Sequence, residues 1–309
     1  MSVMYRSIAD MNNCILRCLD KFPHDVDLIV GVPRSGMLPA NLLALYLNKP
    51  YTDIDSFVEG RIYGCGERGN FINDNKSKKV IVMDDSYCSG NAYRKARKKI
   101  ESAVQMEGCS ITYGVVFTTS AGKDVVDYWC EEINDFRVFQ WNLFHHKGII
   151  GKSCFDIDGV LCPNPPVDDD GPLYLEYVKN APSLYIPSLE IDTLVSCRLE
   201  KYREETEKWL AAHNVHYKKL VMLNLRSKEE RIRWGKHGEF KADIYKKSSN
   251  VLFVESSLAE ALVIKQKSHK DVFCIETFEM INADDFSDKR HRFFQKCKRR
   301  FLKMLGVKI

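Results

Sequence analysis

A short apolar run that ends in two acids places the tightest constraint on how this chain folds. Residues 80–83 are apolar, too few for a helix and bounded by polar residues, which predicts a buried strand. Asp84 and Asp85 follow where that strand ends, then come the small polar residues 86–91, and a helix is predicted from Ala92. Unpaired backbone N–H groups at such a strand–turn–helix junction bind phosphate, and the helix dipole favours an anion there. The stretch therefore predicts a phosphate site beside two carboxylates.

The acid pair, Asp84 and Asp85, limits which class of phosphate ligand this site can bind. Carboxylates repel a bare phosphate, but they accept hydrogen bonds from the hydroxyls of a ribose that carries the phosphate. An apolar strand, two acids, three further residues and then a hydroxyl residue with glycine, here Ser89 and Gly90, resembles the phosphoribosyl pyrophosphate (PRPP) signature of type I phosphoribosyltransferases. The resemblance implies that Asp84 and Asp85 hold the ribose 2- and 3-hydroxyls. It also implies that the 5-phosphate is cradled by Ser86, Tyr87, Cys88, Ser89, Gly90 and Asn91.

A second loop that suits an anion lies earlier in the chain. Residues 28–32 predict a buried strand and residues 38–47 a helix, with a turn between them. In type I phosphoribosyltransferases the loop after this strand binds pyrophosphate through a basic residue and a small one, a pattern matched by Arg34, Ser35 and Gly36. An arginine can hold phosphate oxygens through two parallel N–H donors. The resemblance implies an α/β domain with a doubly wound parallel sheet over residues 1–148.

Three other segments of this half have less specific patterns. Apolar spacing predicts a helix over residues 3–21 and a short helix within residues 125–129. The glycine-rich segment 57–70 contains Arg61 and Arg68. It is either a lid that closes over PRPP and excludes water, or an exposed hairpin with two solvated arginines. The sequence leaves this choice open.

The second half carries a strand that ends in the pattern Asp-x-Asp-Gly, at residues 156–159. Two acids at positions i and i+2 of a strand point to the same side. One can then attack a phosphorus atom while the other moves the proton of the leaving group, with Mg²⁺ shielding phosphate from carboxylate. The pattern resembles motif I of haloacid-dehalogenase-type (HAD) phosphatases. By that resemblance Asp156 is the nucleophile that becomes an aspartyl phosphate, and Asp158 is the general acid and then the base that activates water.

Later residues match the remaining motifs of that family in order. Ser196 ends a predicted strand, where the family has a hydroxyl that holds a phosphate oxygen, and Lys241 matches the lysine that balances charge on the phosphorylated aspartate. Glu255 ends another predicted strand, where the family supplies one or two acids for Mg²⁺, but here two serines follow. The resemblance implies a HAD-like Rossmannoid domain with a small cap over residues 149–285. It also implies a metal site formed by Asp156, Asp158 and Glu255.

The composition is that of a globular protein, with 45% apolar and 28% charged residues. No apolar run approaches the ~20 residues that cross a bilayer, and residues 1–13 lack the apolar core of a signal peptide. The eleven cysteines are scattered without Cys-x-x-Cys pairs, which predicts reduced thiols and a cytoplasmic location. A net charge of +4 by itself predicts no nucleic-acid partner.

Residues 286–309 are predicted to form a separate basic tail. Nine Lys or Arg lie between Lys289 and Lys308. One face of the predicted helix carries Phe293, Cys297, Phe301 and Leu305. A helix of this kind binds an anionic membrane surface, each basic residue near the lipid adding ~1 kcal/mol, or it packs its aromatic face on the preceding domain. Both interpretations stay open, so a peripheral place at the inner face of the membrane is one of two expectations.

The pairing of the two domains predicts the overall reaction. A PRPP-dependent transferase joins 5-phosphoribose to an acceptor and releases pyrophosphate, and a phosphatase on the same chain then removes the 5-phosphate. Tethering raises the concentration of the intermediate at the second site. The arrangement resembles the two-domain ribofuranosyltransferases of bacterial polysaccharide synthesis. That resemblance implies PRPP as donor, a glycan hydroxyl as acceptor, lipid-linked if the tail faces a membrane, and Mg²⁺ at both sites.

Three other interpretations stay open, one of which is that the two halves act on unrelated substrates and are fused only for co-expression. The other two are functions of the whole chain. One is a nucleobase phosphoribosyltransferase fused to a 5-nucleotidase-like phosphatase, which would need a base-stacking surface beside the first site. The other is a PRPP-sensing regulator without turnover, which the set of phosphatase motifs argues against. The sequence does not identify the acceptor, the anomer formed or the oligomeric state.

Overall fold

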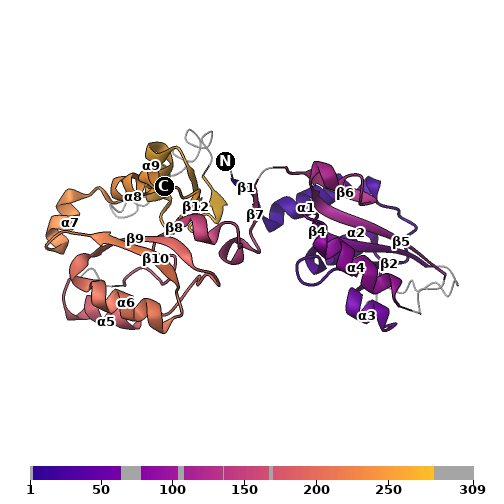
Figure 1. Ribbon diagram of the computed structural model, residues 1–309, viewed down its shortest axis with the longest axis horizontal. Coiled ribbons are helices and arrows are strands. Elements are labelled where there is room, and N and C mark those ends of the chain that lie inside the picture. Colours follow the sequence, from indigo (N-terminus) through magenta and orange to yellow (C-terminus); the bar gives the residue numbers. More distant parts are fainter. Residues whose placement is uncertain (1–2, 64–77, 104–107, 135, 167–169, 282–309) are drawn as a thin grey trace, which may run out of the picture. The chain divides into compact units, whose positions relative to one another are not determined.

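The computed structural model describes residues 3–63, 78–103, 108–134, 136–166 and 170–281 (Figure 1). The chain divides into two compact units. The first unit is Arg6–Trp141, and the second combines Met1–Tyr5 with Asn142–Ile309. The predicted basic tail and residues 64–70 of the glycine-rich segment lie outside the described residues. Within the described ranges, no helix has both the length and the apolar character needed to cross a membrane.

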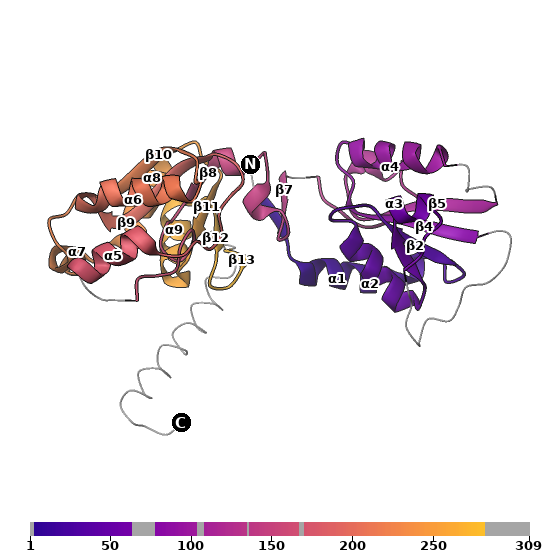
Figure 2. The same ribbon diagram turned by 90° about the horizontal axis from the view of Figure 1, so that it is seen from below.

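The first unit is built on a five-stranded parallel sheet with the strand order β3-β2-β4-β5-β6. Its strands are β2 (Leu28–Gly31), β3 (Tyr51–Asp53), β4 (Lys78–Ser86), β5 (Cys109–Thr118) and β6 (Tyr128–Glu132). Its helices are α1 (Ile8–Arg17), α2 (Met37–Leu47), α3 (Ile54–Val58) and α4 (Asn91–Glu101), and β7 (Phe136–Phe139) follows. Helices α1 and α2 lie on one side of the sheet and α4 on the other (Figure 2). Both faces of the sheet are therefore buried, which explains the continuous apolar run of residues 80–83.

Two helix predictions in this unit are wrong in part. Residues 3–21 contain β1 (Val3–Arg6) and then α1, not one helix. Ser7 ends the strand and starts the helix, because its hydroxyl accepts from the Asp10 N–H while the Asp10 carboxylate accepts from the Ser7 N–H. The segment 125–129 is not helical but leads into β6, where pairing with β5 overrides the local pattern.

The second unit is built on a six-stranded sheet with the order β10-β9-β8-β11-β12-β13, parallel except for β13. Its strands are β8 (Ser153–Phe155), β9 (Ile191–Leu199), β10 (Tyr217–Leu223), β11 (Leu252–Glu255), β12 (Asp271–Cys274) and β13 (Glu279–Met280). Its helices are α5 (Pro172–Asn180), α6 (Arg203–Ala212), α7 (Lys228–Trp234), α8 (His237–Lys247) and α9 (Leu258–Ser268). Helices α8 and α9 pack together on one face through Ala242, Tyr245, Ala261 and Ile264. Short 3₁₀ turns occur in the chain at Leu19–Lys21, Ser120–Gly122, Leu143–His145, Ile150–Lys152 and Glu200–Tyr202.

In both sheets the first parallel strand lies inside the sheet, and the chain adds later strands first on one side of it and then on the other. In the first, the chain runs from β2 outward to β3 and then returns to place β4 on the other side of β2. In the second, β9 and β10 lie on one side of β8, and β11 and β12 on the other. The crevice at the carboxyl ends of such strands is where open α/β sheets bind ligands. The loops predicted to bind PRPP lie at the carboxyl ends of β2 and β4. Of the predicted phosphatase acids, Asp156 and Asp158 follow β8 and Glu255 is the last residue of β11.

Substitution of a buried residue of the second unit tests whether its sheet is packed as described. Leu252 on β11 is fully buried, whereas Leu173 on α5 is 64% exposed. We expect Leu252→Ala to lower the free energy of unfolding by about 2–5 kcal/mol, because it leaves a cavity between packed layers. Leu173→Ala should change it by less than about 0.5 kcal/mol. Denaturant unfolding of both variants measures the difference, and equal losses would contradict the placement of Leu252.

Candidate functional site

The loop after β2 and the acids at the end of β4 lie against each other. A Cβ atom added at Gly36 would come within 2.7 Å of Asp84 Oδ1 and 2.7 Å of the Val32 carbonyl oxygen. Only glycine allows this approach, so the predicted pyrophosphate loop, with Arg34 and Ser35, is in contact with the predicted diol-binding pair. The Pro33–Arg34 peptide bond is cis. The structure thus brings two segments that are distant in sequence to one edge of the sheet.

The acid pair itself carries more than one hydrogen bond. The backbone N–H of Asp85 donates to Asp84 Oδ1 at 2.8 Å, and Trp141 Nε1 donates to Asp85 Oδ2 at 2.7 Å. Burial and the neighbouring Asp85 charge raise the pKa of the Asp84 carboxyl to about 8. Asp84 therefore keeps a proton more readily than an ordinary carboxyl, which lowers the repulsion a phosphate would meet there.

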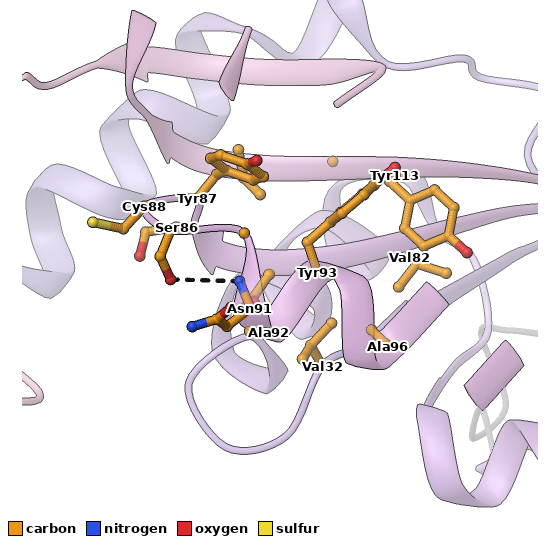
Figure 3. A pocket seen from close by; sticks show the side chains of 15 residues that line it. Val32, Val82, Ser86, Tyr87, Cys88, Asn91, Ala92, Tyr93, Ala96 and Tyr113 are labelled. Carbon is orange, nitrogen blue, oxygen red and sulfur yellow. Dashed lines mark hydrogen bonds between the residues drawn. The ribbon is translucent and has the colours of Figure 1, made fainter. Parts of the chain in front are cut away.

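The loop from Ser86 to Asn91 leads into the N-terminus of α4 (Figure 3). Gly90 has φ +72°, a left-handed conformation, and a Cβ there would lie 2.6 Å from Tyr87 Oη. The Asn91 N–H is 3.5 Å from Ser89 Oγ, the contact that the dashed line marks. This loop borders a cavity of about 110 Å³ whose wall includes Asp84. Ser86, Tyr87, Cys88, Ser89, Gly90 and Asn91 all line it, together with Tyr93 and Tyr113.

Three residues that the sequence did not single out complete this site. Arg94 Nη2 donates to the Ser89 carbonyl at 3.0 Å and to Asn91 Oδ1 at 2.6 Å. Arg137 donates to the Tyr87 carbonyl, and Trp141 bonds Asp85 as described. Arg94 lies one turn into the predicted α4, so its reach to the loop could have been inferred. No local pattern pointed to Arg137 or Trp141, because they lie far from the loop in sequence.

In the second unit, one buried ammonium group gathers three carboxylates. Lys241 Nζ lies 2.7 Å from Asp156 Oδ2, 2.8 Å from Glu255 Oε2 and 2.8 Å from Glu260 Oε2. Asp156 follows β8, Glu255 ends β11, and Lys241 and Glu260 lie on α8 and α9. The structure thus brings together the predicted nucleophile, lysine and strand-end acid. It adds Glu260, whose position five residues after Glu255, in the first turn of the next helix, was a signal that the sequence analysis missed.

The pKa values of Lys241, Asp156 and Glu260 depend on one another. Burial, then the nearby Glu255 and Asp158 charges, raise the pKa of Asp156 well above its usual range, although Lys241 opposes this. Burial also disfavours the Lys241 ammonium, but the three carboxylates outweigh it and raise the lysine pKa. The pKa of Glu260 falls to about 2, because contacts with His237 and Lys241 outweigh its burial. The cluster is therefore held by a charged lysine among carboxylates that compete for it.

Asp158 is held by different partners. Arg198 Nη2 donates to Asp158 Oδ1 at 2.7 Å, its Nε lies 3.1 Å from Oδ2, and the Arg198 side chain is 0% exposed. The Tyr177 hydroxyl donates to Oδ1 at 2.7 Å. Burial opposes ionisation of Asp158, but Arg198 and Tyr177 hold the pKa of this carboxyl below its usual range. The described arrangement therefore favours the carboxylate form of Asp158.

The cavity in front of these acids measures about 660 Å³. It is lined by Asp156, Asp158, Gly159, Asn164, Cys197, Arg231, His237, Lys241, Glu255, Ser256 and Glu260, among others. Ser196 does not line it: the Ser196 hydroxyl accepts from the Arg198 N–H at 3.1 Å, and the neighbouring Cys197 faces the cavity. Arg231 and His237 are two further lining residues that the sequence did not single out.

The donor chemistry around Asp156 fits Mg²⁺. Three carboxylates face one ammonium, so hard oxygen ligands and an excess of negative charge occur together. In the part of the chain that the structure describes, no three His, Cys, Asp or Glu side chains form a metal-binding group of their own. Mg²⁺ commonly keeps several waters and binds through one or two carboxylates plus a substrate phosphate, so it does not need such a group.

The raised pKa of Asp84 predicts how stability depends on pH. The folded protein keeps a proton that the unfolded chain loses near pH 4, so the free energy of unfolding should fall as the pH rises from about 4 to about 8. Asp84→Asn should remove this fall and stabilise the protein at pH 8 by about 1–3 kcal/mol. Asp124→Asn, at an exposed site of the same unit, should keep the wild-type slope. Denaturant unfolding across this pH range measures both.

The Lys241 cluster predicts a second stability effect. Lys241→Met leaves three carboxylates without their ammonium partner, so we expect a loss of about 3–5 kcal/mol at pH 7. The variant lacks the ammonium that helps to hold the Glu260 pKa near 2, so this carboxyl can bind a proton at lower pH and the loss should shrink toward pH 4. Lys246→Met, at an exposed position of the same helix, is the matched control and should cost less than about 0.5 kcal/mol. A loss that does not change with pH would argue against charge as its cause.

Compared with known proteins, the sequence matches no family model and no curated protein. Among solved structures, a purine phosphoribosyltransferase from Pyrococcus horikoshii aligns with a TM-score of 0.35 and 20% identity, over 46% of this chain and 94% of that one. A Helicobacter pylori xanthine-guanine-hypoxanthine phosphoribosyltransferase aligns with a TM-score of 0.35 and 16% identity, over 46% and 93%. An orotate phosphoribosyltransferase from Aeropyrum pernix aligns with a TM-score of 0.29 and 20% identity, over 40% and 69%. Likenesses of this size assign neither a substrate nor a reaction to this chain.

Proposed function

We propose that the first unit transfers 5-phosphoribose from PRPP to an acceptor and releases pyrophosphate. The observation that carries this proposal is the convergence of three parts at the carboxyl ends of β2 and β4. These are the loop with Arg34, the acid pair, and the phosphate-type loop before α4. They supply a cation, two carboxylates and the backbone N–H groups that precede α4, which match the pyrophosphate, diol and 5-phosphate of one PRPP molecule.

Each group of residues has a role in this reaction. Arg34, Ser35 and Gly36 hold the pyrophosphate as it leaves carbon 1 with the electrons of the broken C–O bond. The acceptor oxygen or nitrogen forms the new bond to carbon 1 and loses its proton. Asp84 and Asp85 hold the ribose hydroxyls, and residues 86–91 hold the 5-phosphate. These contacts fix the ribose ring while carbon 1 exchanges its bond to pyrophosphate for a bond to the acceptor.

The second unit is proposed to remove the 5-phosphate. Asp156 attacks the phosphorus atom to form an aspartyl phosphate, and Lys241 balances its charge from 2.7 Å away. Asp158 protonates the sugar oxygen that leaves phosphorus. It then takes a proton from the water that attacks the aspartyl phosphate, which releases inorganic phosphate and restores the Asp156 carboxylate. The Arg198 contacts favour its carboxylate form, which suits the second of these steps. Mg²⁺, held by Asp156 with Asp158 and Glu255 as the other proposed ligands, would shield the phosphate from the carboxylates when bound. Ser196 is proposed to hold a phosphate oxygen, and for this its hydroxyl must turn from the Arg198 N–H toward the cavity.

The two activities in sequence leave plain ribose on the acceptor, and the proposed acceptor is a glycan hydroxyl. A nucleotide-forming enzyme would gain nothing from removing the phosphate of its own product. Loss of the phosphate also makes the first step hard to reverse. A lipid-linked glycan and a peripheral membrane site belong to the same proposal through residues 286–309, which lie outside the described residues.

One observation favours a nucleobase acceptor as the second candidate. Phe139 and Trp141 stack with ring centroids 4.7 Å apart and planes inclined by 8°, and Phe117 lies 5.1 Å from Phe139. This aromatic group lies beside Asp85. Phe117 and Phe139 are buried, so only the half-buried Trp141 ring could offer the stacking surface that a base would need, and a sugar ring can pack on the same ring.

Mass spectrometry of reactions with PRPP, Mg²⁺ and a panel of glycan and nucleobase acceptors tests the proposal. Wild type should add a pentose to a glycan, and Asp156→Asn should add pentose plus phosphate, because it transfers but cannot remove the phosphate. Rates of 5-phosphate removal should fall at least about 10³-fold in this variant.

The paired control is Asp84→Asn with Asp85→Asn, which should abolish transfer but still hydrolyse a supplied ribosyl 5-phosphate. Nucleoside with wild type and nucleotide with Asp156→Asn would support the second candidate instead. Free phosphate from the Asp156→Asn variant with no phosphoribosylated product would refute the proposed order of steps.

A further inference from the structure

Trp141 makes a side-chain hydrogen bond to the acid pair from outside the PRPP signature. Its indole Nε1 lies 2.7 Å from Asp85 Oδ2, and Asp85 is only 7% exposed. An indole has one N–H and accepts no hydrogen bond, so this contact always supplies a donor to the carboxylate. A hydrogen bond to a charged group inside a protein is stronger than one between neutral groups. The orientation of the Asp85 carboxylate therefore depends on the position of the Trp141 ring.

That ring is itself fixed. Trp141 stacks on Phe139, and Phe139 on Phe117, and these two phenylalanines are 3% and 0% exposed. Two residues before Phe139, Arg137 donates to the Tyr87 carbonyl in the phosphate loop. Residues 137–141 thus contact the acid pair and the phosphate loop at once. A movement of this segment would disturb both halves of the ribose 5-phosphate site.

The bond also distinguishes the two acids. Neighbouring carboxylates cannot both be charged without a cost, and a donor stabilises the charge on the carboxylate it contacts. Trp141 reaches Asp85, whereas Asp84 accepts from the backbone N–H of Asp85. The two acids therefore have different hydrogen-bond partners, and within the described part of the chain only Asp85 is held by a side chain from outside the signature.

We propose that Trp141 is a positioning residue for the ribose of PRPP, acting through its indole N–H on Asp85. This inference rests on the proposed function, since it assumes that Asp85 binds a ribose hydroxyl. It predicts that loss of the N–H weakens ligands that contain the ribose ring and spares pyrophosphate, which contacts the loop of residues 34–36. A structural role alone would weaken all ligands together.

Isothermal titration of the full chain with PRPP, ribose 5-phosphate and pyrophosphate, at one fixed Mg²⁺ concentration, separates these cases. Every protein in this titration, including the wild-type reference, also carries Asp156→Asn, so that the proposed phosphatase does not hydrolyse the ribose ligands. Trp141→Phe keeps an aromatic ring without the N–H. We expect its affinity for PRPP and ribose 5-phosphate to fall about tenfold or more, and its affinity for pyrophosphate to stay within about twofold. For 2-deoxyribose 5-phosphate the loss should be smaller if Asp85 holds the 2-hydroxyl.

Trp209→Phe is the matched control. Trp209 lies on α6 of the second unit, where its indole N–H donates to the Ala181 carbonyl at 2.7 Å, so this variant also removes a buried indole N–H but leaves the first unit unchanged. Its variant should bind all three ligands as wild type does. Should Trp141→Phe fail to fold, site-specific replacement of Trp141 by benzothienylalanine keeps the two-ring shape and changes only the N–H to sulfur.

The outcomes are distinct. Selective loss of the two ribose ligands supports the inference. Unchanged affinities, or equal losses for all three ligands, overturn it while leaving the proposed function intact if wild type binds PRPP. A wild-type protein that binds neither PRPP nor ribose 5-phosphate overturns the proposed function of the first unit, and the inference with it.

Discussion

Negative charge gathered at the end of a buried parallel strand is the constraint on which both units depend. Each sheet delivers acids to the point where its strand order changes, and each must hold them without free contact with water. The first unit does so by burial that raises the pKa of the Asp84 carboxyl and by an indole N–H that donates to Asp85. The second unit uses the ammonium of Lys241 and the guanidinium of Arg198. The two solutions suit a sugar diol and a phosphate group, respectively.

These solutions also explain why the supporting residues come from distant segments. A carboxylate at a strand end can be reached only by side chains that the sheet brings to the same edge. Trp141 reaches Asp85 across 56 positions, and Lys241 reaches Asp156 across 85. In the second unit Arg198 comes from β9, next to the strand that precedes Asp158. The acids belong to short sequence motifs, whereas Trp141, Lys241 and Arg198, which contact them, lie outside those motifs.

The sequence was a good guide to elements whose pattern is local. The strand predicted at residues 80–83 lies inside β4, the helix predicted from Ala92 is α4, and the helix predicted at 38–47 is α2. It failed where tertiary pairing decided the outcome, as at residues 125–129, which lead into a strand because β5 pairs with the segment that follows. It also missed Glu260, although the spacing from Glu255 was available.

By itself, the sequence determined that this chain forms two α/β units, each with acids, hydroxyls and glycines at strand ends, since apolar runs and turn residues act within a few positions of one another. Only the tertiary structure decided which charges these acids meet. It placed Cys197 rather than Ser196 toward the second cavity, turned Asp158 to Arg198, and set Trp141 on Asp85. The reason is physical: alternation along a strand sets the face of each side chain, but burial and packing against distant segments select its partner.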